Sequence, residues 1–321
     1  MSILIFIDHA EGQIKKTSFE TMSYGTALAK QTGTDAEGIF LGTTNEDLTA
    51  LGKYGLKKIH HISQVALNQL DADQFIDVIS SAAEKSGTSV IVLSHNNTGR
   101  AIAPGLSARL KAGLVTGAIG LPDTSNGFIV KKNVFSGKAF CTLSIKTTVK
   151  IISINPNAYP IQTGEGTAEI ISENTSLKPA RVSTKKISRA SGEIPLTEAE
   201  IVVSGGRGMK GPENWGPIEE LARLLHAATA CSRPVADAGW RPHHEHVGQT
   251  GIAIAPNLYI AIGISGAIQH LAGVNRSKII VVINKDPEAP FFKSADYGIV
   301  GDAFEVLPKL IQALKKFKGV A

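Results

Sequence analysis

The feature that most limits the possible folds of this chain is a regular alternation of apolar runs with stretches of helical spacing. In the first half, the apolar runs are SILIFID, AEGIFLG, KKIHHIS and SVIVLSH. The stretches with helical spacing are residues 18–32, 45–53, 72–86 and 98–111. Strands that alternate with helices in this way predict an α/β fold with a mainly parallel sheet and crossover helices.

The pattern changes at residues 127–156, which read GFIVKKNVFSGKAFCTLSIKTTVKIISI. A Ser-Gly turn joins two extended runs there, and this predicts an antiparallel hairpin that closes the first sheet. Residues 157–200 are rich in Ser, Thr, Pro and charge, as a connector would be. The α/β rhythm then restarts, so we expect two α/β domains, at residues 1–190 and 191–321.

Length and charge agree with this division and limit the possible partners. A chain of 321 residues is longer than one typical core needs, so two domains of about 150 residues each are expected. The net charge of +5 is partly local, in a cluster formed by Lys178, Arg181, Lys185, Lys186 and Arg189. With 6% aromatic residues and no nucleic-acid-binding motif, this cluster predicts a solvated connector and no nucleic-acid partner.

Two apolar stretches of the chain could suggest a membrane segment, but neither predicts one. Asp8 interrupts the first apolar run too early for a secretory signal. Residues 246–275 contain no Asp, Glu, Lys or Arg, but Pro256, Asn257 and several glycines break them into a loop, a strand and a helix. We therefore expect no membrane insertion. The two cysteines are far apart in sequence, which indicates a reducing compartment.

The second half opens with EIVVSGGRGMKGPENWGPIEELARLLHAA, in which Gly206, Gly208 and Gly211 match the dinucleotide fingerprint G-x-G-x-x-G. Two interpretations have equal weight here: a turn that approaches a pyrophosphate, and a glycine-rich turn without a ligand. An NAD site would have a carboxylate at the end of the next strand. This chain has Ser232 and Arg233 at that place.

Several polar residues stand at the ends of the strands expected in this half. They are Arg207, Ser265, Asn284 and Asp302. Because parallel strands end at one edge of a sheet, where ligands bind, these residues predict a nucleotide cofactor site. We expect a helix to begin at Ser265, because its small first residues would expose backbone N–H groups to a phosphate. His270 would then reach a ring beyond the phosphates, or be a core histidine bound to a carbonyl.

The run of motifs SGGRG, SRPVADAG, VGQTG, LYIAIGISGAIQHLAG and IVVINKDPEAPFFKSADYGIVGD closely resembles the C-terminal, FAD-binding part of the electron transfer flavoprotein α subunit family. The resemblance covers about residues 200–318, and GISGAIQHLAG and INKDPEAP are its most specific parts. Residues 1–190 resemble the family more loosely, through the α/β layout and SHNNTGRAIAPGLSARLKAGLVTGAIGL. The resemblance implies a Rossmann-like or doubly wound C-terminal domain and a partner-facing N-terminal domain.

The resemblance also implies a set of FAD-binding residues. These are Arg207, Ser232, Arg233, Val247, Gly248, Gln249, Thr250, Ser265, Gly266, Ala267, Ile268, Gln269, His270, Asn284 and Asp302. Arg233 would lie against the isoalloxazine and, with His270, would favour an anionic reduced flavin, because a cation stabilises the negative charge of reduction. Thr250 would contact flavin N5. Residues 265–267 would hold the pyrophosphate, and Asn284 and Asp302 would serve the adenosine half.

The function implied is electron transport rather than conversion of a substrate. Such a chain forms a heterodimer with a β subunit and carries electrons from acyl-CoA dehydrogenases of fatty acid β-oxidation, or related dehydrogenases, to a quinone oxidoreductase. Three positions depart from the family pattern: Ile252 replaces a common Lys, Pro234 a small residue and Ala303 a Leu. The compartment would be the bacterial cytoplasm, or the mitochondrial matrix for a processed eukaryotic chain.

Three alternatives stay open. One is an NAD(P)-dependent oxidoreductase that uses the glycines at residues 206–211, with Arg233 recognising a 2′-phosphate. Another is a regulatory α/β protein with a vestigial nucleotide site. The third concerns His243, His244 and His246, which could suggest a metal site, but Glu245 between them and the lack of a distant ligand set favour a solvated loop.

Overall fold

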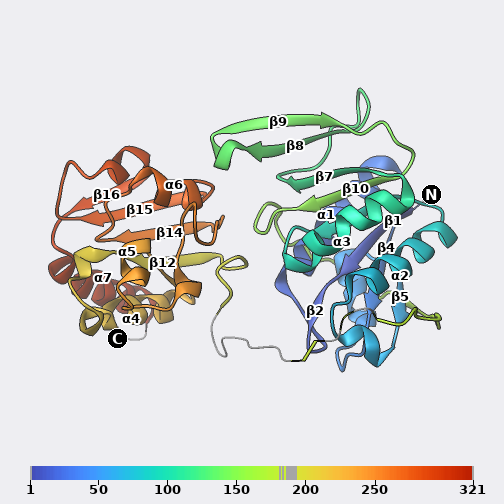
Figure 1. Ribbon diagram of the computed structural model, residues 1–321, viewed down its shortest axis with the longest axis horizontal. Helices are drawn as coiled ribbons and strands as arrows, with labels where there is room; N and C mark the ends of the chain where they lie inside the picture. Colours follow the sequence, from blue (N-terminus) through green and yellow to red (C-terminus); the bar gives the residue numbers. More distant parts are fainter. Residues whose placement is uncertain (1, 181, 183, 186–193, 320–321) are drawn as a thin grey trace. The chain divides into compact units, whose positions relative to one another are not determined.

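The computed structural model describes residues 2–180, 182, 184, 185 and 194–319. The chain divides into two compact units, Met1–Arg189 and Ala190–Ala321, here called the N-terminal and C-terminal units (Figure 1). The expected domain boundary near residue 190 lies outside the described residues, as do Arg181, Lys186 and Arg189 of the basic cluster.

The N-terminal unit is built on a nine-stranded sheet with the order β11-β5-β4-β1-β6-β10-β7-β8-β9. Its strands are β1 (Ser2–Ile7), β4 (Asp35–Leu41), β5 (Lys58–Ile62), β6 (Thr88–Ser94), β7 (Gly113–Ala118), β8 (Ile129–Val134), β9 (Ala139–Ser144), β10 (Lys150–Ile154) and β11 (Glu169–Ser172). All neighbours are parallel except β7–β8 and β8–β9. The predicted α/β class with a mainly parallel sheet is confirmed.

Helices cover both faces of this sheet, because successive side chains of β1 point to opposite sides. Ile5 packs in one core with Met22 and Leu28 of α1 (Lys16–Thr32). Leu4 packs in the other core with residues of α2 (Ala72–Lys85) and α3 (Asn97–Leu110). The continuous apolar run of β1 therefore reflects burial on both faces, as is typical of parallel sheets.

Two details of this unit differ from the sequence-based expectation. The predicted helix at 45–53 is a 3-10 helix, η1 (Leu48–Tyr54), which Asp47 caps through a hydrogen bond from the Thr49 amide. The predicted hairpin exists as β8 and β9, but residues 150–154 do not belong to it. They form β10, which lies between β6 and β7 in the sheet. Strand order depends on distant partners, which a local pattern does not specify.

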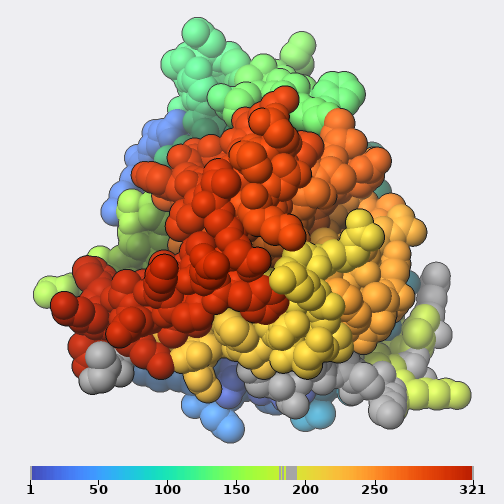
Figure 2. All heavy atoms as spheres, turned by 90° about the vertical axis from the view of Figure 1, so that its left-hand side faces the viewer, coloured from blue at the N-terminus to red at the C-terminus, as the bar shows by residue number. Residues whose placement is uncertain are grey.

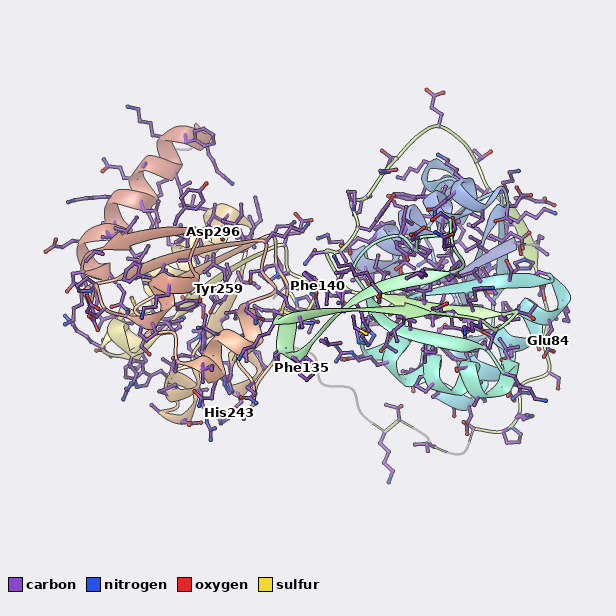
Figure 3. All side chains as sticks on the ribbon, turned by 90° about the horizontal axis from the view of Figure 1, so that it is seen from above. Glu84, Phe135, Phe140, His243, Tyr259 and Asp296 are labelled. Carbon is purple, nitrogen blue, oxygen red and sulfur yellow. The ribbon has the colours of Figure 1, made fainter. Side chains whose placement is uncertain are left out.

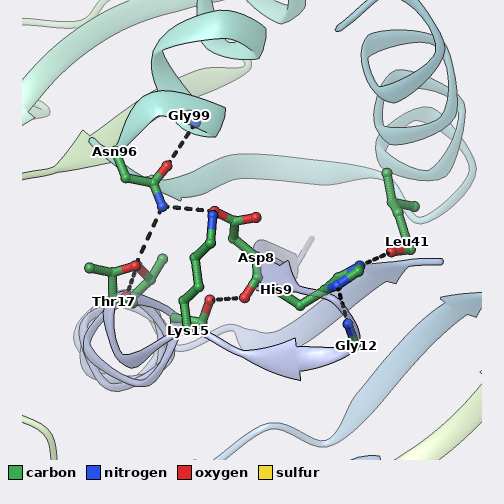
Figure 4. A network of polar contacts seen from close by, with 10 residues as sticks. Asp8, His9, Gly12, Lys15, Thr17, Leu41, Asn96 and Gly99 are labelled. Atoms are coloured by element: carbon green, nitrogen blue, oxygen red, sulfur yellow. Dashed lines mark hydrogen bonds and ion pairs between the residues drawn. The ribbon is translucent and has the colours of Figure 1, made fainter. Parts of the chain in front are cut away.

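Polar side chains join the ends of β1 and β6 in this unit (Figure 4). The Asp8 carboxylate accepts hydrogen bonds from Lys15 Nζ and Asn96 Nδ2, both at 2.7 Å. Asn96 also caps α3, because its Oδ1 accepts from the Gly99 amide at 3.0 Å. The unit's own side chains thus bind one another at the sheet edge where α/β folds usually bind ligands.

The C-terminal unit has a five-stranded, all-parallel sheet with the order β13-β12-β14-β15-β16. The strands are β12 (Ile201–Gly205), β13 (Ala228–Cys231), β14 (Leu258–Ile262), β15 (Ile279–Asn284) and β16 (Tyr297–Val300). This is the doubly wound order 2-1-3-4-5, in which the chain reverses direction across the sheet between the first and third strands. The reversal therefore lies between β12 and β14.

Two helices pack together on one face of this sheet, α4 (Gly216–Leu225) and α7 (Ala303–Lys318). Leu221 of α4 and Leu307 of α7 share one core, and the two helices lie side by side on the surface (Figure 2). The other core contains Tyr259, Phe291 and Val274, the last from α6 (Ile268–Val274). Among the described residues, no helix is both long and apolar enough to cross a membrane.

Candidate functional site

A cavity of about 510 Å³ lies at the carboxyl ends of the strands of the C-terminal unit. It is lined by Arg207, Gly208, Ser232, Arg233, Pro234, His246, Val247, Gly248, Gln249, Thr250, Gly263, Ile264, Ser265, Ala267, Gln269, His270, Asn284 and Asp286. The lining residues follow β12, β13, β14 and β15, on both sides of the reversal. Open α/β sheets bind ligands at this place, and the volume is that of a small-molecule site.

Glycines let two of these strand ends approach each other closely. A Cβ atom at Gly208 would lie 2.6 Å from the Cα of Gly263, and one at Gly206 would lie 2.2 Å from the Gly263 carbonyl oxygen. The Gly208 amide donates to the Gly263 carbonyl at 3.0 Å. Gly206 and Gly208 are thus required by backbone packing. Gly208 also lines the cavity, whereas Gly206 and Gly211 do not.

The segment Ser265 to Ala267 was expected to be the first turn of a helix, and this expectation is wrong. Helix α6 begins at Ile268, with Ala267 in an extended conformation before it. Gly266 has φ +80°, and a Cβ there would lie 2.4 Å from Cβ of Phe291. The small residues therefore form an irregular connection that packs closely against Phe291. Ser265 and Ala267 face the cavity, and Ala267 is the N-cap of α6, so the helix N-terminus meets the cavity at Ala267 rather than at Ser265.

A loop from His246 to Thr250 forms another wall of the cavity. The Val247 amide donates to the Cys231 carbonyl at 3.1 Å, and the Gln249 amide donates to the Gln269 carbonyl at 2.7 Å. A Cβ at Gly273 would lie 2.5 Å from the Gly248 Cα. The loop is therefore held between β13 and α6 by its backbone, and Gln249 and Thr250 are exposed.

His270 is buried beside the cavity in contact with Tyr259, which lies inside the C-terminal unit (Figure 3). The Tyr259 hydroxyl is 2.8 Å from His270 Nε2. Burial, reinforced by the nearby His246, lowers the pKa of His270 from 6.5 to about 4, and burial raises the pKa of Tyr259 well above its ordinary value. Among the described residues, His270 Nδ1 has no hydrogen-bond partner. The backbone of Val247 acts against burial and raises the pKa of His270.

Charges of both signs line the cavity. Arg207 and Arg233 contribute guanidinium groups, and Asp286 contributes a carboxylate. Arg233 is 63% exposed and lies 3.3 Å from Asp237 in an ion pair, so solvent and Asp237 screen part of its charge. Two arginines against one carboxylate leave a positive balance, which suits an anionic ligand.

The structure brings most of the predicted binding residues to this one cavity. Gly266, Ile268 and Asp302 do not line it. Ile268 is 61% exposed. Asp302 caps α7 by accepting from the Phe304 amide at 3.0 Å, and it lies 3.9 Å from Lys210.

Lining residues that the sequence-based set of binding residues omitted are Gly208, Pro234, His246, Gly263, Ile264 and Asp286. Gly263, Ile264 and Asp286 stand within two residues of the ends of β14 and β15, which is the signal that could have identified them. Asn284 was found by that signal, and Asp286 hydrogen-bonds to its side chain through the Asp286 amide at 3.0 Å.

Comparison with protein families and known proteins identifies the kind of site. Residues 195–275 match the electron transfer flavoprotein FAD-binding domain, and residues 3–177 match the electron transfer flavoprotein domain. The electron transfer flavoprotein subunit alpha of Bacillus subtilis is 35% identical over 322 residues, covering 98% of this chain and 97% of that protein. This chain belongs to the electron transfer flavoprotein α subunit family.

Two further relatives show the breadth of the electron transfer flavoprotein α subunit family. The subunit alpha of Mycobacterium leprae is 36% identical, covering 98% of this chain and 99% of that protein. A probable mitochondrial subunit alpha of Cryptococcus neoformans is 34% identical, covering 99% of this chain and 93% of that protein. The relatives are thus bacterial and mitochondrial, and membership in the family implies a β subunit as partner.

FAD is the cofactor of the domain that residues 195–275 match, and the cavity fits it. The positive balance from Arg207 and Arg233 suits an anionic dinucleotide such as FAD. The turns at Gly208 and Gly263 carry no side chain that would block a close approach. The positive charge of the cavity and its glycine positions thus agree with an electron transfer flavoprotein.

Proposed function

We propose that this chain is the α subunit of an electron transfer flavoprotein heterodimer. It carries electrons from acyl-CoA dehydrogenases of fatty acid β-oxidation, or related dehydrogenases, to a quinone oxidoreductase. The observation that carries the proposal is the cavity at the carboxyl ends of β12 to β15, with Arg207 and Arg233 at its wall, both in the segment that matches the FAD-binding domain. FAD, when bound, supplies the capacity to accept and release electrons singly.

The side chains of this cavity bind and orient the cofactor rather than react with it. Arg233 lies against the isoalloxazine ring and offsets the negative charge of reduction. Thr250 offers its hydroxyl to N5, and the exposed position of the Thr250 side chain in its loop supports this role. His270, neutral because burial lowers its pKa to about 4, acts as a polar contact and not as a second cation.

The remaining lining residues serve the dinucleotide part of FAD. Ser265 and Ala267 hold the pyrophosphate where the chain passes from β14 into α6. Asn284 orients the adenosine half, and its Nδ2 donates to the Ile264 carbonyl at 3.0 Å, which fixes its position. For Asp302, which caps α7 and does not line the cavity, we propose contact with the adenosine half. Asp286 is closer to Asn284 and shares this role.

The N-terminal unit faces the partner in this proposal. Its hairpin supports this role, because Phe135 is 80% exposed and Phe140 is 63% exposed, and both lie at the turn end of the hairpin (Figure 3). Exposed aromatic side chains at one end of a hairpin are typical of surfaces that bind other proteins. The bacterial cytoplasm or the mitochondrial matrix would be the compartment, in line with the relatives.

The test is to purify the chain together with a candidate β subunit and record its visible absorption spectrum. We expect flavin bands that an acyl-CoA dehydrogenase with its substrate bleaches, and electron delivery from the reduced protein to a quinone oxidoreductase. A colourless complex, or bleaching by NADPH without any dehydrogenase, would contradict the proposal. The second result would favour the NAD(P)-dependent alternative.

A further inference from the structure

The cavity loop His246–Thr250 begins directly after an ion pair whose carboxylate is buried. Glu245 is 1% exposed, and Arg241 binds it with two hydrogen bonds. Arg241 Nε donates to Oε2 at 2.9 Å and Nη2 donates to Oε1 at 2.5 Å. An arginine that binds a carboxylate with two parallel hydrogen bonds fixes its orientation as well as its distance.

The same pair connects two further elements of the C-terminal unit. Arg241 Nη1 donates to Glu219 of α4 at 2.8 Å, and Thr229 of β13 donates from Oγ1 to Glu245 Oε1 at 3.2 Å. The guanidinium also lies 5.7 Å from the ring of Trp215. The segment from Arg241 to Glu245 is thus bound to β13 and α4 by side chains that lie outside the cavity.

Backbone contacts connect the ion pair of Arg241 and Glu245 to the cavity wall. His246 follows Glu245 and forms a parallel bridge with Cys231, two residues beyond Thr229. The Ile252 amide donates to the His246 carbonyl at 2.9 Å, so both ends of the loop meet at His246. A shift of Glu245 would therefore move the residues that reach the cofactor cavity.

We propose that Arg241 and Glu245 are positioning residues for the FAD site: their ion pair holds the loop His246–Thr250 in place, although neither residue lines the cavity. This inference rests on the proposed function for its effect on FAD, but its effect on the loop does not. It also gives the run RPHHEH a role, since Glu245 binds Arg241 across that run. Removing Arg241 would leave the buried carboxylate of Glu245 without a compensating charge, so Glu245 depends on Arg241 for its position.

The first experiment replaces Arg241→Lys, which keeps the charge but removes the two parallel hydrogen bonds. We expect FAD to dissociate about tenfold more readily. In the protein without FAD, we expect faster hydrogen exchange at the amides of residues 247–250. The matched control is Lys315→Met, which removes the 2.7 Å pair between α7 and Glu220 of α4 on the surface of the same unit. The control should change neither quantity.

A second variant separates positioning from folding. Arg241→Met combined with Glu245→Met replaces the ion pair by apolar side chains, a change that proteins often tolerate. We expect this variant to unfold like the wild type while its loop exchanges faster and FAD binds more weakly. Wild-type affinity and exchange in both variants would overturn the inference. If the wild type with its β subunit bound no FAD, the proposed function would fail, while the exchange measurement would still test the positioning role.

Discussion

The hydroxyl of Tyr259 lies 2.8 Å from Nε2 of His270, and both side chains are buried in the C-terminal unit. Burial raises the pKa of Tyr259, so its phenol stays protonated at neutral pH. Burial also lowers the pKa of His270 to about 4, so its ring stays neutral. His270 therefore adds no positive charge beside the cavity, and Arg233 carries the charge that sequence analysis had assigned to both residues together.

The first prediction concerns the pH dependence of stability. The folded-state pKa of His270 lies below its unfolded value of 6.5, so the stability that depends on the neutral ring is present above pH 6.5 and is lost as pH falls toward 4. Lowering the pH from 7 to 5 should therefore reduce the free energy of unfolding by about 2 kcal/mol through His270. Urea unfolding followed by fluorescence measures this in the C-terminal unit, which contains both tryptophans, Trp215 and Trp240.

His270→Gln is the variant that isolates this effect. It removes the titrating ring, so its loss of stability from pH 7 to pH 5 should be smaller than that of the wild type by about 2 kcal/mol. His246, whose pKa burial also lowers, remains in both proteins. Equal losses in the two proteins would show that His270 is not held neutral by the fold.

The second prediction is that Tyr259→Phe destabilises the C-terminal unit by about 1–3 kcal/mol, because it leaves Nε2 of the buried His270 without its partner. The readout is the tryptophan unfolding transition at pH 7. Tyr24→Phe is the matched control, since Tyr24 is also fully buried and donates to the Gly120 carbonyl at 3.0 Å in the N-terminal unit. Identical tryptophan transitions for Tyr259→Phe and the wild type would contradict the importance of this contact.

Local patterns predicted the strands because burial on both faces requires continuous apolar runs, as in β1 and β14. They did not predict the place of β10, which is set by pairing with β6 and β7. The small residues at 265–267 suited two structures, a helix start and an irregular connection packed against a neighbour. The structure has the second, and its neighbour is Phe291, which is distant in sequence.

The cavity was predictable where a residue stands at the end of a strand or within two residues of it, as Arg207, Ser232 and Asn284 do. The family resemblance added the loop at residues 247–250, which no strand end indicates. The ion pair of Arg241 and Glu245 was not predicted, because the sequence indicated a solvated histidine loop around Glu245. Its contacts with Thr229 of β13 and, through Arg241, with Glu219 of α4 depend on the tertiary structure.

The third prediction is that Arg233→Ala lowers the reduction potential of bound FAD, because it removes a positive charge that offsets the charge of reduction. For an exposed charge at about 4 Å the effect is about 1 kcal/mol, or about 45 mV for one electron. A potentiometric titration measures it. Arg223→Ala removes the same charge from the exposed face of α4, away from the cavity, and should leave the potential unchanged. Equal potentials in both variants would place the Arg233 charge away from the flavin ring.

The fourth prediction concerns residues 265–267, which precede α6. Gly266→Ala should destabilise the C-terminal unit by about 1–3 kcal/mol, because φ +80° is unfavourable for alanine and the new Cβ would lie 2.6 Å from the Cα of Phe291. The strain should also displace Ser265 and Ala267 and weaken FAD binding. Gly216→Ala, at the start of α4, has no atom within 4 Å of the new Cβ and should be neutral or stabilising. Gly266→Ala could also unfold at the same urea concentration as Gly216→Ala and keep full FAD occupancy. That result would show that the contact between Gly266 and Phe291 does not shape this wall of the cavity.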